Sequence, residues 1–334
     1  MTGYLAQPLA FPDKAPDGFE PLEKEPEFDP RRHLQIERPD RVESLRDFGY
    51  SEEDIAACPT DFAVTSIFRV LSDEGVACLQ DVASQLEQFT TSNARIARNV
   101  RGGVYRSRFL RDLCASTDLT EAMSEISGCP LLPHTLPHQQ GHLNYNPLEV
   151  GKNVDKWHVD TLRIDFVMFV TDPRSVEGGE FEYYRGTKHE VEALVKAGKP
   201  LDPAKIVAPD MPGPGHAVLQ QGNMVVHRAK GLRAPGRRIT MVNGYVPRDI
   251  TFPDFSRFDQ LSLVDPEAVA SAEYARHVAW MARERLQAEL NSISFEGNAN
   301  ALADRFAKHA TLMAETADQL RAAGTGQLEH FGDG

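Results

Sequence analysis

The segment Trp157-His158-Val159-Asp160 opens the stretch that decides the fold, which continues to Pro247. Short apolar runs rich in β-branched and aromatic residues, such as Ile164–Val170 and Met224–Val226, follow one another along it. Glycine- and proline-containing turns separate these runs, at 177–179, 212–215 and 221–223. Many short strands with frequent turns predict an antiparallel barrel or jelly roll rather than a parallel α/β sheet.

Helical patterns lie on both sides of this stretch. Apolar residues from Val76 to Phe89 recur at helical spacing, and two Ala-rich amphipathic runs cover 268–290 and 300–322. The first 40 residues carry scattered prolines and single apolar residues, a composition that cannot build its own core. We therefore expect an α+β protein with four parts: an extended arm over 1–40, a helical layer over 41–130, a β core over 131–250 and a helical extension over 251–334. The last three parts are expected to form one domain.

Composition limits the partners and the compartment. A formal net charge of −13 does not suit a broad phosphate-backbone contact, so we expect no nucleic-acid partner. Signal-peptide features and long apolar runs are absent from the sequence, so we expect a cytoplasmic protein without membrane contact. Four cysteines without a C-x-x-C pair are typical of reduced thiols.

Two histidines and an aspartate could hold a metal ion. His158 and Asp160 stand at the mouth of a strand, where side chains two residues apart point to the same side. His227 follows an apolar strand much later in the chain, so only a folded-back sheet brings the three together. Two imidazoles and one carboxylate on one face of an ion leave open positions, which suits non-haem Fe(II) better than Zn(II). His134 and His138 lie in a proline-punctuated loop, and we leave them outside this site.

A cation for a keto-acid carboxylate follows in Gly236-Arg237-Arg238-Ile239-Thr240. Arg237 and Arg238 point to opposite faces of an extended segment, so only one of them can face inward. We favour Arg238 because Thr240 shares its face and adds a hydroxyl donor. A guanidinium can hold a carboxylate through two hydrogen bonds.

These motifs, in this order, resemble the Fe(II)- and 2-oxoglutarate-dependent dioxygenases built on the double-stranded β-helix, a jelly-roll or cupin-like barrel. The matched pattern is His158-x-Asp160, Gly178-Gly179-Glu180-Phe181, His227 and Gly236-x-Arg238-x-Thr240. The resemblance covers residues 140–247. It implies His158, Asp160 and His227 as iron ligands, and Arg238, helped by Thr240, as the clamp on 2-oxoglutarate. The preceding helices, including 106–110, are similar to the phytanoyl-CoA hydroxylase-like branch.

The resemblance also implies the reaction. Fe(II), 2-oxoglutarate and O2 would give succinate, CO2 and a ferryl species that takes hydrogen from a small molecule. Hydroxylation is the default, with desaturation and ring closure left open. Asp160 fills the position that halogenating members leave open for chloride. The residues are also compatible with two other classes of protein. One is a non-catalytic cupin-like protein that binds a metal or ligand, and the other is a Zn(II) hydrolase that uses the same three side chains.

Substrate contacts are assigned to residues from segments near the barrel mouth: Asn144, Tyr145, Arg163, Tyr183 and Arg185. The two arginines among them would favour an acidic small molecule. Asp155 and Asp165 are expected to be loop or surface acids. The C-terminal helices are a candidate homodimer contact.

Overall fold

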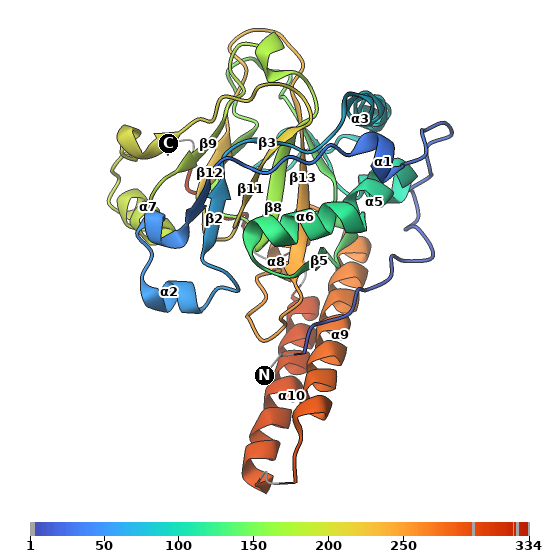
Figure 1. Ribbon diagram of the computed structural model, residues 1–334, viewed down its shortest axis with the longest axis vertical. Helices are drawn as coiled ribbons and strands as arrows, with labels where there is room; N and C mark the ends of the chain where they lie inside the picture. Colours follow the sequence, from blue (N-terminus) through green and yellow to red (C-terminus); the bar gives the residue numbers. More distant parts are fainter. Residues whose placement is uncertain (1–3, 296–297, 323, 325–326, 333–334) are drawn as a thin grey trace.

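The computed structural model describes residues 4–295, 298–322, 324 and 327–332. It contains two antiparallel sheets that pack face to face, with helices on the outside (Figure 1). The larger sheet has the order β1 (Val42–Ser44), β2 (Phe62–Thr65), β11 (His216–Gln220), β8 (Ile164–Phe169), β13 (Ile239–Pro247), β6 (His142–Tyr145), β4 (Asn99–Val100), with β3 (Phe68–Arg69) beside β11 and β5 (Leu131–Pro133) beside β13. The smaller sheet has the order β10 (Ile206–Val207), β9 (Phe181–Tyr184), β12 (His227–Ala229), β7 (Asp155–His158).

From β6 onward the chain passes back and forth between the two sheets. β6, β8, β11 and β13 belong to the larger sheet, whereas β7, β9, β10 and β12 belong to the smaller one. A jelly roll exchanges strands between two facing antiparallel sheets in this manner. The prediction of a mixed protein with antiparallel rather than parallel sheets is confirmed.

β8 shows how the sequence decides the layers. All six of its residues are buried, because Phe166 and Met168 face the outer helices while Val167 and Phe169 face the smaller sheet. A strand that is covered on both faces has a continuous apolar sequence, whereas a strand with one exposed face alternates between apolar and polar residues.

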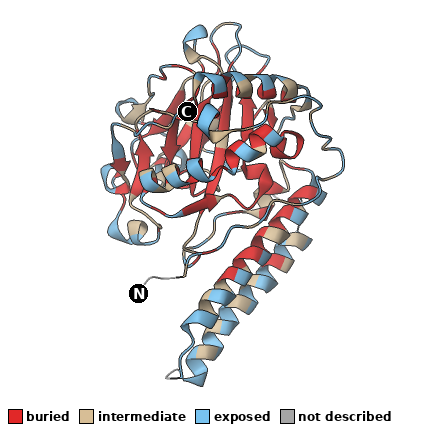
Figure 2. Cartoon of the chain, turned by 45° about the vertical axis from the view of Figure 1, so that its right-hand side comes forward, coloured by how far each residue is buried: buried red, intermediate tan, exposed pale blue. Residues whose placement is uncertain are grey.

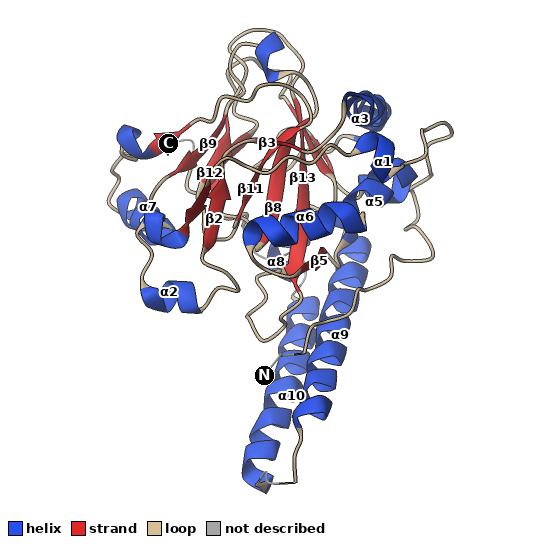
Figure 3. Ribbon diagram, viewed as in Figure 1, coloured by secondary structure: helices blue, strands red, loops and turns tan. Residues whose placement is uncertain are grey.

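Helices cover the outer face of the larger sheet and extend from one end of it (Figure 3). Three of them pack on that face: α3 (Asp73–Leu86), α5 (Arg108–Cys114) and α6 (Thr117–Ser127). The others are α1 (Pro30–His33), α2 (Glu52–Ala56), α4 (Gly103–Arg106), α7 (Lys188–Lys196), α8 (Phe258–Leu261), α9 (Glu267–Ser292) and α10 (Ala299–Arg321). Ser72 caps α3 by accepting the N–H of Gly75, and Gly128 ends α6 in the left-handed conformation.

Residues 41–130 are not a purely helical layer, which corrects the sequence-based expectation. They also contribute β1, β2, β3 and β4 to the larger sheet. These strands have between two and four residues, too few for a period-two pattern to show in the sequence. The described part of the arm is mostly without regular secondary structure and contains the short helix α1, and its Leu22 and Phe28 pack on the core.

α9 and α10 form a hairpin that projects from the sheets (Figure 1). Their bounds match the predicted runs to within a few residues. α9 packs on the body as far as Glu284, while the rest of α9 has no buried residue and most of α10 is exposed (Figure 2). None of the described helices is both long and apolar enough to span a membrane.

Candidate metal centre

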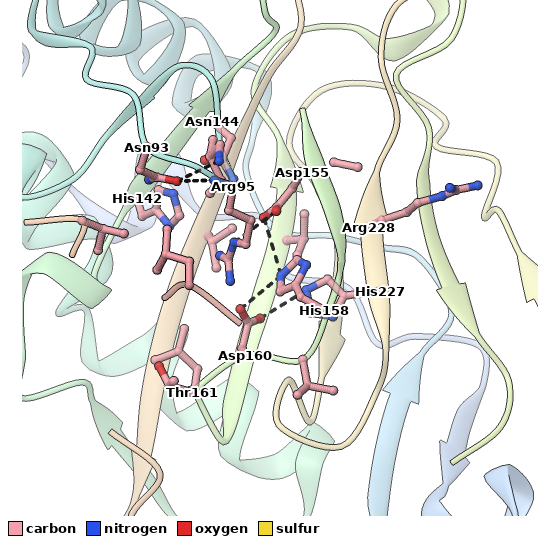
Figure 4. Close-up of a pocket in the computed structure, with 18 of the residues that line it drawn as sticks. Asn93, Arg95, His142, Asn144, Asp155, His158, Asp160, Thr161, His227 and Arg228 are labelled. Atoms are coloured by element: carbon pink, nitrogen blue, oxygen red, sulfur yellow. Dashed lines mark hydrogen bonds and ion pairs between the residues drawn. The ribbon is translucent and has the colours of Figure 1, made fainter. Parts of the chain in front are cut away.

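Strand pairing brings His158 and His227 together. His158 ends β7, His227 begins β12, and the two residues are direct partners across the antiparallel ladder. Their ring centroids lie 4.2 Å apart. Asp160 follows His158 in the next loop, where its N–H donates to Gly222 O at 2.9 Å. Figure 4 shows the carboxylate of Asp160 against both imidazoles.

Each histidine presents the same nitrogen to Asp160. The Nδ1 of His158 lies 2.6 Å from Lys156 O, and the Nδ1 of His227 lies 2.9 Å from Val225 O. Because a carbonyl oxygen can only accept, both Nδ1 atoms carry the proton and both Nε2 atoms face the cavity. Asp160 Oδ1 lies 3.4 Å from His158 Nε2, and Asp160 Oδ2 lies 3.2 Å from His227 Nε2. One ligand atom from each of the three residues falls within 4.8 Å of the others, so the set fits a single metal ion.

The charges of these groups depend on one another. Burial alone would raise the pKa of Asp160, but the charge of His227 and hydrogen bonds from both histidines bring this pKa well below its ordinary value. Burial alone would lower the pKa of His227, but the neighbouring Asp160 raises it to about 9. Without a metal the pair is therefore a carboxylate beside an imidazolium. A bound cation would take the place of the proton on His227.

The structure places Arg238 inside the molecule and Arg237 outside. Arg238 is 1% exposed, and its Nε donates to Gly179 O at 2.7 Å and its Nη1 to Thr240 Oγ1 at 3.2 Å. Arg237 instead forms an ion pair with Glu87 at 2.9 Å. Gly179 has φ of +75°, and a Cβ there would lie 2.9 Å from the Cδ of Arg238. The glycine turn thus gives the guanidinium its space.

One nitrogen of this buried guanidinium is unused. Nη2 of Arg238 has no hydrogen-bond partner among the described residues, although Arg238 and Thr240 line the same cavity as the three candidate ligands. Burial lowers the pKa of Arg238 to about 10, so it stays charged at neutral pH. Leaving a buried donor unpaired costs roughly 1–3 kcal/mol. An anionic ligand in the cavity would remove this penalty.

β6 supplies two further polar side chains to the cavity. His142 and Asn144 alternate along this strand on the same face, and both line the cavity. His142 Nε2 and Asn144 Oδ1 are buried without a hydrogen-bond partner in the described part of the chain. The sequence interpretation named Asn144 and missed His142, although the two-residue spacing on a strand was the available signal.

Two arginines on the cavity wall were not assigned to the site from sequence. Arg95 pairs with Asp155 at 3.1 Å, and Asp155 Oδ2 lies 3.6 Å from His158 Nε2 (Figure 4). Arg101 donates two hydrogen bonds to Asp265, at 2.6 and 2.9 Å. Both guanidiniums are therefore neutralised by acids within the protein.

Four of the five assigned substrate contacts lie away from this cavity, which corrects those assignments. The hydroxyl of Tyr145 donates to Ala83 O at 2.7 Å on the helix-covered side of the larger sheet. Tyr183 is buried between the sheets and stacks on Phe48.

The two assigned arginines are also elsewhere. Arg163 donates to Pro253 O from both Nε and Nη2, and Arg185 forms an ion pair with Glu43 at 2.6 Å. Both are held by contacts within the protein, so neither is aimed at the metal centre.

Asp155 and Asp165 are not surface acids, in contrast to the expectation. Asp155 is 4% exposed and Asp165 is fully buried. Burial, followed by the negative charge of Asp160, raises the pKa of Asp165 well above its ordinary value. Gln220 links this acid to the centre, since its Nε2 lies 3.0 Å from Asp165 Oδ1 and 3.2 Å from His227 Nε2.

No protein-family model and no curated protein matches the sequence. Solved structures with a similar fold include the "non-heme alpha ketoglutarate dependent epimerase SnoN from nogalamycin biosynthesis", at 16% identity over 60% of this chain and 87% of that one, with a TM-score of 0.42. EctD from S. alaskensis with bound Fe is 17% identical over 71% of this chain and 89% of its own, with a TM-score of 0.42. HygX from Streptomyces hygroscopicus with nickel and 2-oxoglutarate bound is 15% identical over 59% of this chain and 87% of its own, with a TM-score of 0.37.

Similarity at this level concerns the course of the backbone only. A functional conclusion for this chain therefore has to come from its own side chains and the cavity they line.

Proposed function

We propose that this protein is a non-haem Fe(II)- and 2-oxoglutarate-dependent oxygenase, built on a double-stranded β-helix, that acts on a small molecule. His158, Asp160 and His227 would hold the iron, and Arg238 with Thr240 would bind the far carboxylate of 2-oxoglutarate. When bound, iron with 2-oxoglutarate and O2 would supply the oxidation of a substrate C–H bond, coupled to the release of succinate and CO2. Hydroxylation is the proposed outcome.

The observation that carries this proposal is the pairing of two features in one cavity. The first is a buried set of two imidazoles and one carboxylate with its ligand atoms within 4.8 Å of one another. The second is a buried, charged guanidinium whose Nη2 has no hydrogen-bond partner within the described chain. A metal site alone would not require this cation. A bidentate acid that binds both the metal and Arg238 accounts for the two features together.

The protein's own groups have distinct roles in this proposal. The carbonyl oxygens of Lys156 and Val225 fix the two imidazole rings and keep their Nε2 atoms available. Gly179 O and Thr240 Oγ1 hold the Arg238 guanidinium in place, so little side-chain entropy is lost when an anion binds.

A Zn(II) hydrolase is less well supported by the same cavity, because it would need a general base beside metal-bound water. The other acids that line the cavity in the described chain are each ion-paired: Asp155 with Arg95, and Glu329 with Arg257. His142 is a poor base, since burial and the nearby charges of Arg101 and Arg95 lower its pKa to about 3.

The expectation of an acidic substrate rested on Arg163 and Arg185, and these two residues lie outside the cavity. Arginines that do line it, apart from Arg238, each form an ion pair: Arg95 with Asp155, Arg101 with Asp265, and Arg228 with Glu182. We therefore propose a substrate whose recognition does not depend on a free guanidinium.

The test is anaerobic addition of Fe(II) and 2-oxoglutarate, followed by measurement of the weak visible metal-to-keto-acid charge-transfer band. The wild type should develop the band, and Asp160→Ala should not. Arg238→Ala should need about 100-fold more 2-oxoglutarate, because it loses a charge-assisted contact of about 3 kcal/mol. Arg237→Ala is the matched control, because it removes the neighbouring guanidinium on the opposite face and should behave as wild type.

A wild-type protein that binds Fe(II) but develops no band would overturn the co-substrate assignment. A band that is equally sensitive to Arg237→Ala and Arg238→Ala would overturn the role of Arg238 specifically. A hydrolase would instead show activity with Zn(II) that is independent of 2-oxoglutarate.

A further inference from the structure

A C-terminal strap, defined here as residues 327–332, lies beside the metal centre. β7 is an edge strand of the smaller sheet, where β12 is its only partner strand in the described chain. On the other side of β7, Phe331 N–H donates to Trp157 O at 2.6 Å and Trp157 N–H donates to Gly332 O at 2.9 Å. The strap therefore extends the sheet by one antiparallel bridge, directly before His158.

Gln260, in α8, anchors the strap a second time. Its Nε2 donates to Gln327 O at 3.1 Å, and its Oε1 accepts the N–H of Glu329 at 3.0 Å. One side-chain amide thus binds the strap backbone on both sides of Leu328, as a neighbouring strand would. An ion pair between Arg257 and Glu329 at 2.7 Å adds to this anchor.

The ring of Phe331 forms the third anchor. It packs against an apolar cluster that contains Trp157, Tyr184 and Val191. Phe331 is only half-buried, so this contact is weaker than a core contact.

The strap also forms part of the cavity wall. Leu328 and Glu329 line the same cavity as His158, Asp160 and His227. Leu261 and Val264, from α8 and the residues after it, line the cavity too. Two segments far apart in sequence, joined by Gln260, therefore contribute aliphatic side chains to one wall.

We propose that the C-terminal strap is a cover of the active site, held by Gln260 and Phe331, that shields the metal centre and opens to admit ligands. The proposal rests on the proposed function for the identity of the site, but the cover itself can be tested without turnover. Two backbone hydrogen bonds, the Gln260 amide, the Arg257–Glu329 ion pair and a half-buried ring hold the strap. Its opening therefore requires less free energy than global unfolding.

The test uses two full-length variants, Phe331→Ala and Gln260→Ala, each of which removes one anchor and leaves the metal-ligand set intact. Hydrogen–deuterium exchange of the metal-free protein should be faster for the peptide that contains Trp157, because its N–H bonds to the strap. Removal of bound Co(II) by 1,10-phenanthroline should be about tenfold faster than in wild type, as expected when local opening becomes easier. The equilibrium affinity for Co(II) should change little.

Leu290→Ala serves as a matched control, since Leu290 is a large apolar residue exposed on the distant hairpin. It should leave both rates as in wild type. Unchanged exchange and unchanged Co(II) removal in both anchor variants would overturn the cover. If the wild type binds no Co(II), the metal assignment fails while the exchange measurement still decides whether the strap opens.

Discussion

Gly222 determines how closely the backbone can approach the carboxylates of the metal centre. A Cβ at this position would lie 2.1 Å from Asp165 Oδ2 and 3.0 Å from Asp160 Oδ2. Gly222 O also accepts the N–H of Asp160, so the glycine fixes that residue from two directions. Gly222→Ala should displace Asp160 and weaken metal binding by about tenfold or more, which is the usual effect of disturbing a supporting residue.

Calorimetric titration with Mn(II) would measure this effect without interference from oxygen. Gly213→Ala is the matched control, because its Cβ would meet only the flexible end of Arg174, at 3.4 Å. Equal Mn(II) affinity in the two variants would show that Asp160 tolerates a shift, and that close packing at Gly222 is unimportant for the metal.

His134 should make the protein sensitive to acid. Burial, with a smaller effect of the His277 charge, lowers the pKa of His134 from 6.5 to about 3. Between these values the unfolded chain binds the proton and the folded chain does not, so stability is lost as the pH falls below 6.5. At pH 5 this loss should reach about 2 kcal/mol. Urea unfolding at pH 7 and pH 5 would measure it.

His134→Asn provides the comparison, because an amide oxygen can still accept the N–H of Leu136 that His134 Nδ1 accepts in the wild type. The variant should show a smaller difference in unfolding free energy between the two pH values. An identical difference in both proteins would mean that His134 does not contribute to acid sensitivity.

Local geometry explains which site residues could be assigned from sequence. His158 and Asp160, like Arg238 and Thr240, are two residues apart at the end of a strand, and side chains at this spacing share a face where the chain is extended. The same rule shows why Asn144 and Tyr145 could not both reach the cavity: as neighbours on β6 they face opposite sides, and Tyr145 faces the helices. The ion pairs of the cavity arginines depend on long-range contacts that no local pattern records.

At the level of elements, Glu273 joins α9 to the body. Its Oε1 accepts the hydroxyl of Tyr105 at 2.8 Å and faces His138 Nδ1 at 2.7 Å, while its Oε2 accepts the N–H of His138 at 3.1 Å. Glu273→Ala would leave these buried groups without their partner, so we expect a loss of about 3 kcal/mol in the free energy of unfolding. Urea unfolding measures it, and Asp304→Ala, which removes an exposed acid of α10, should cost little. A small loss in both variants would show that α9 docks through its apolar contacts alone.

The predictability of the elements depended on their length. The long helices α9 and α10 and the strand β8 were located from sequence, because each carries a sustained periodicity or a continuous apolar run. β3 and β4 have two residues each, and their pairing depends on a partner strand far away in the chain. Such strands form because β11 and β6 of the larger sheet provide backbone groups for them to pair with, and the residues of β3 and β4 themselves do not reveal this pairing.

For the molecule as a whole, the surface of the hairpin distinguishes it from the body. Large apolar side chains are exposed on α9, on α10 and just after α9: Leu286, Leu290, Ile293, Phe295, Phe306 and Met313. The exposed residues of α10 do not belong to the face that packs inside the molecule, because that face contacts the cluster around Tyr274 through Leu312 and Leu320. Exposed apolar surface on one projecting element often marks an interaction site.

A homodimer through the C-terminal helices therefore stays a prediction with a defined surface. The exposed residues Ala303, Phe306, Ala310 and Met313 follow one another at alternating spacings of three and four, the pattern by which helices pack in coiled coils. Light scattering across a range of concentrations should show a dimer for the wild type and a monomer for Phe306→Glu, because a charge at this position would be buried in the contact. Thr311→Glu adds the same charge outside the stripe and should remain dimeric. A wild type that stays monomeric throughout would contradict the dimer, and a dimer unaffected by Phe306→Glu would move the contact elsewhere on the molecule.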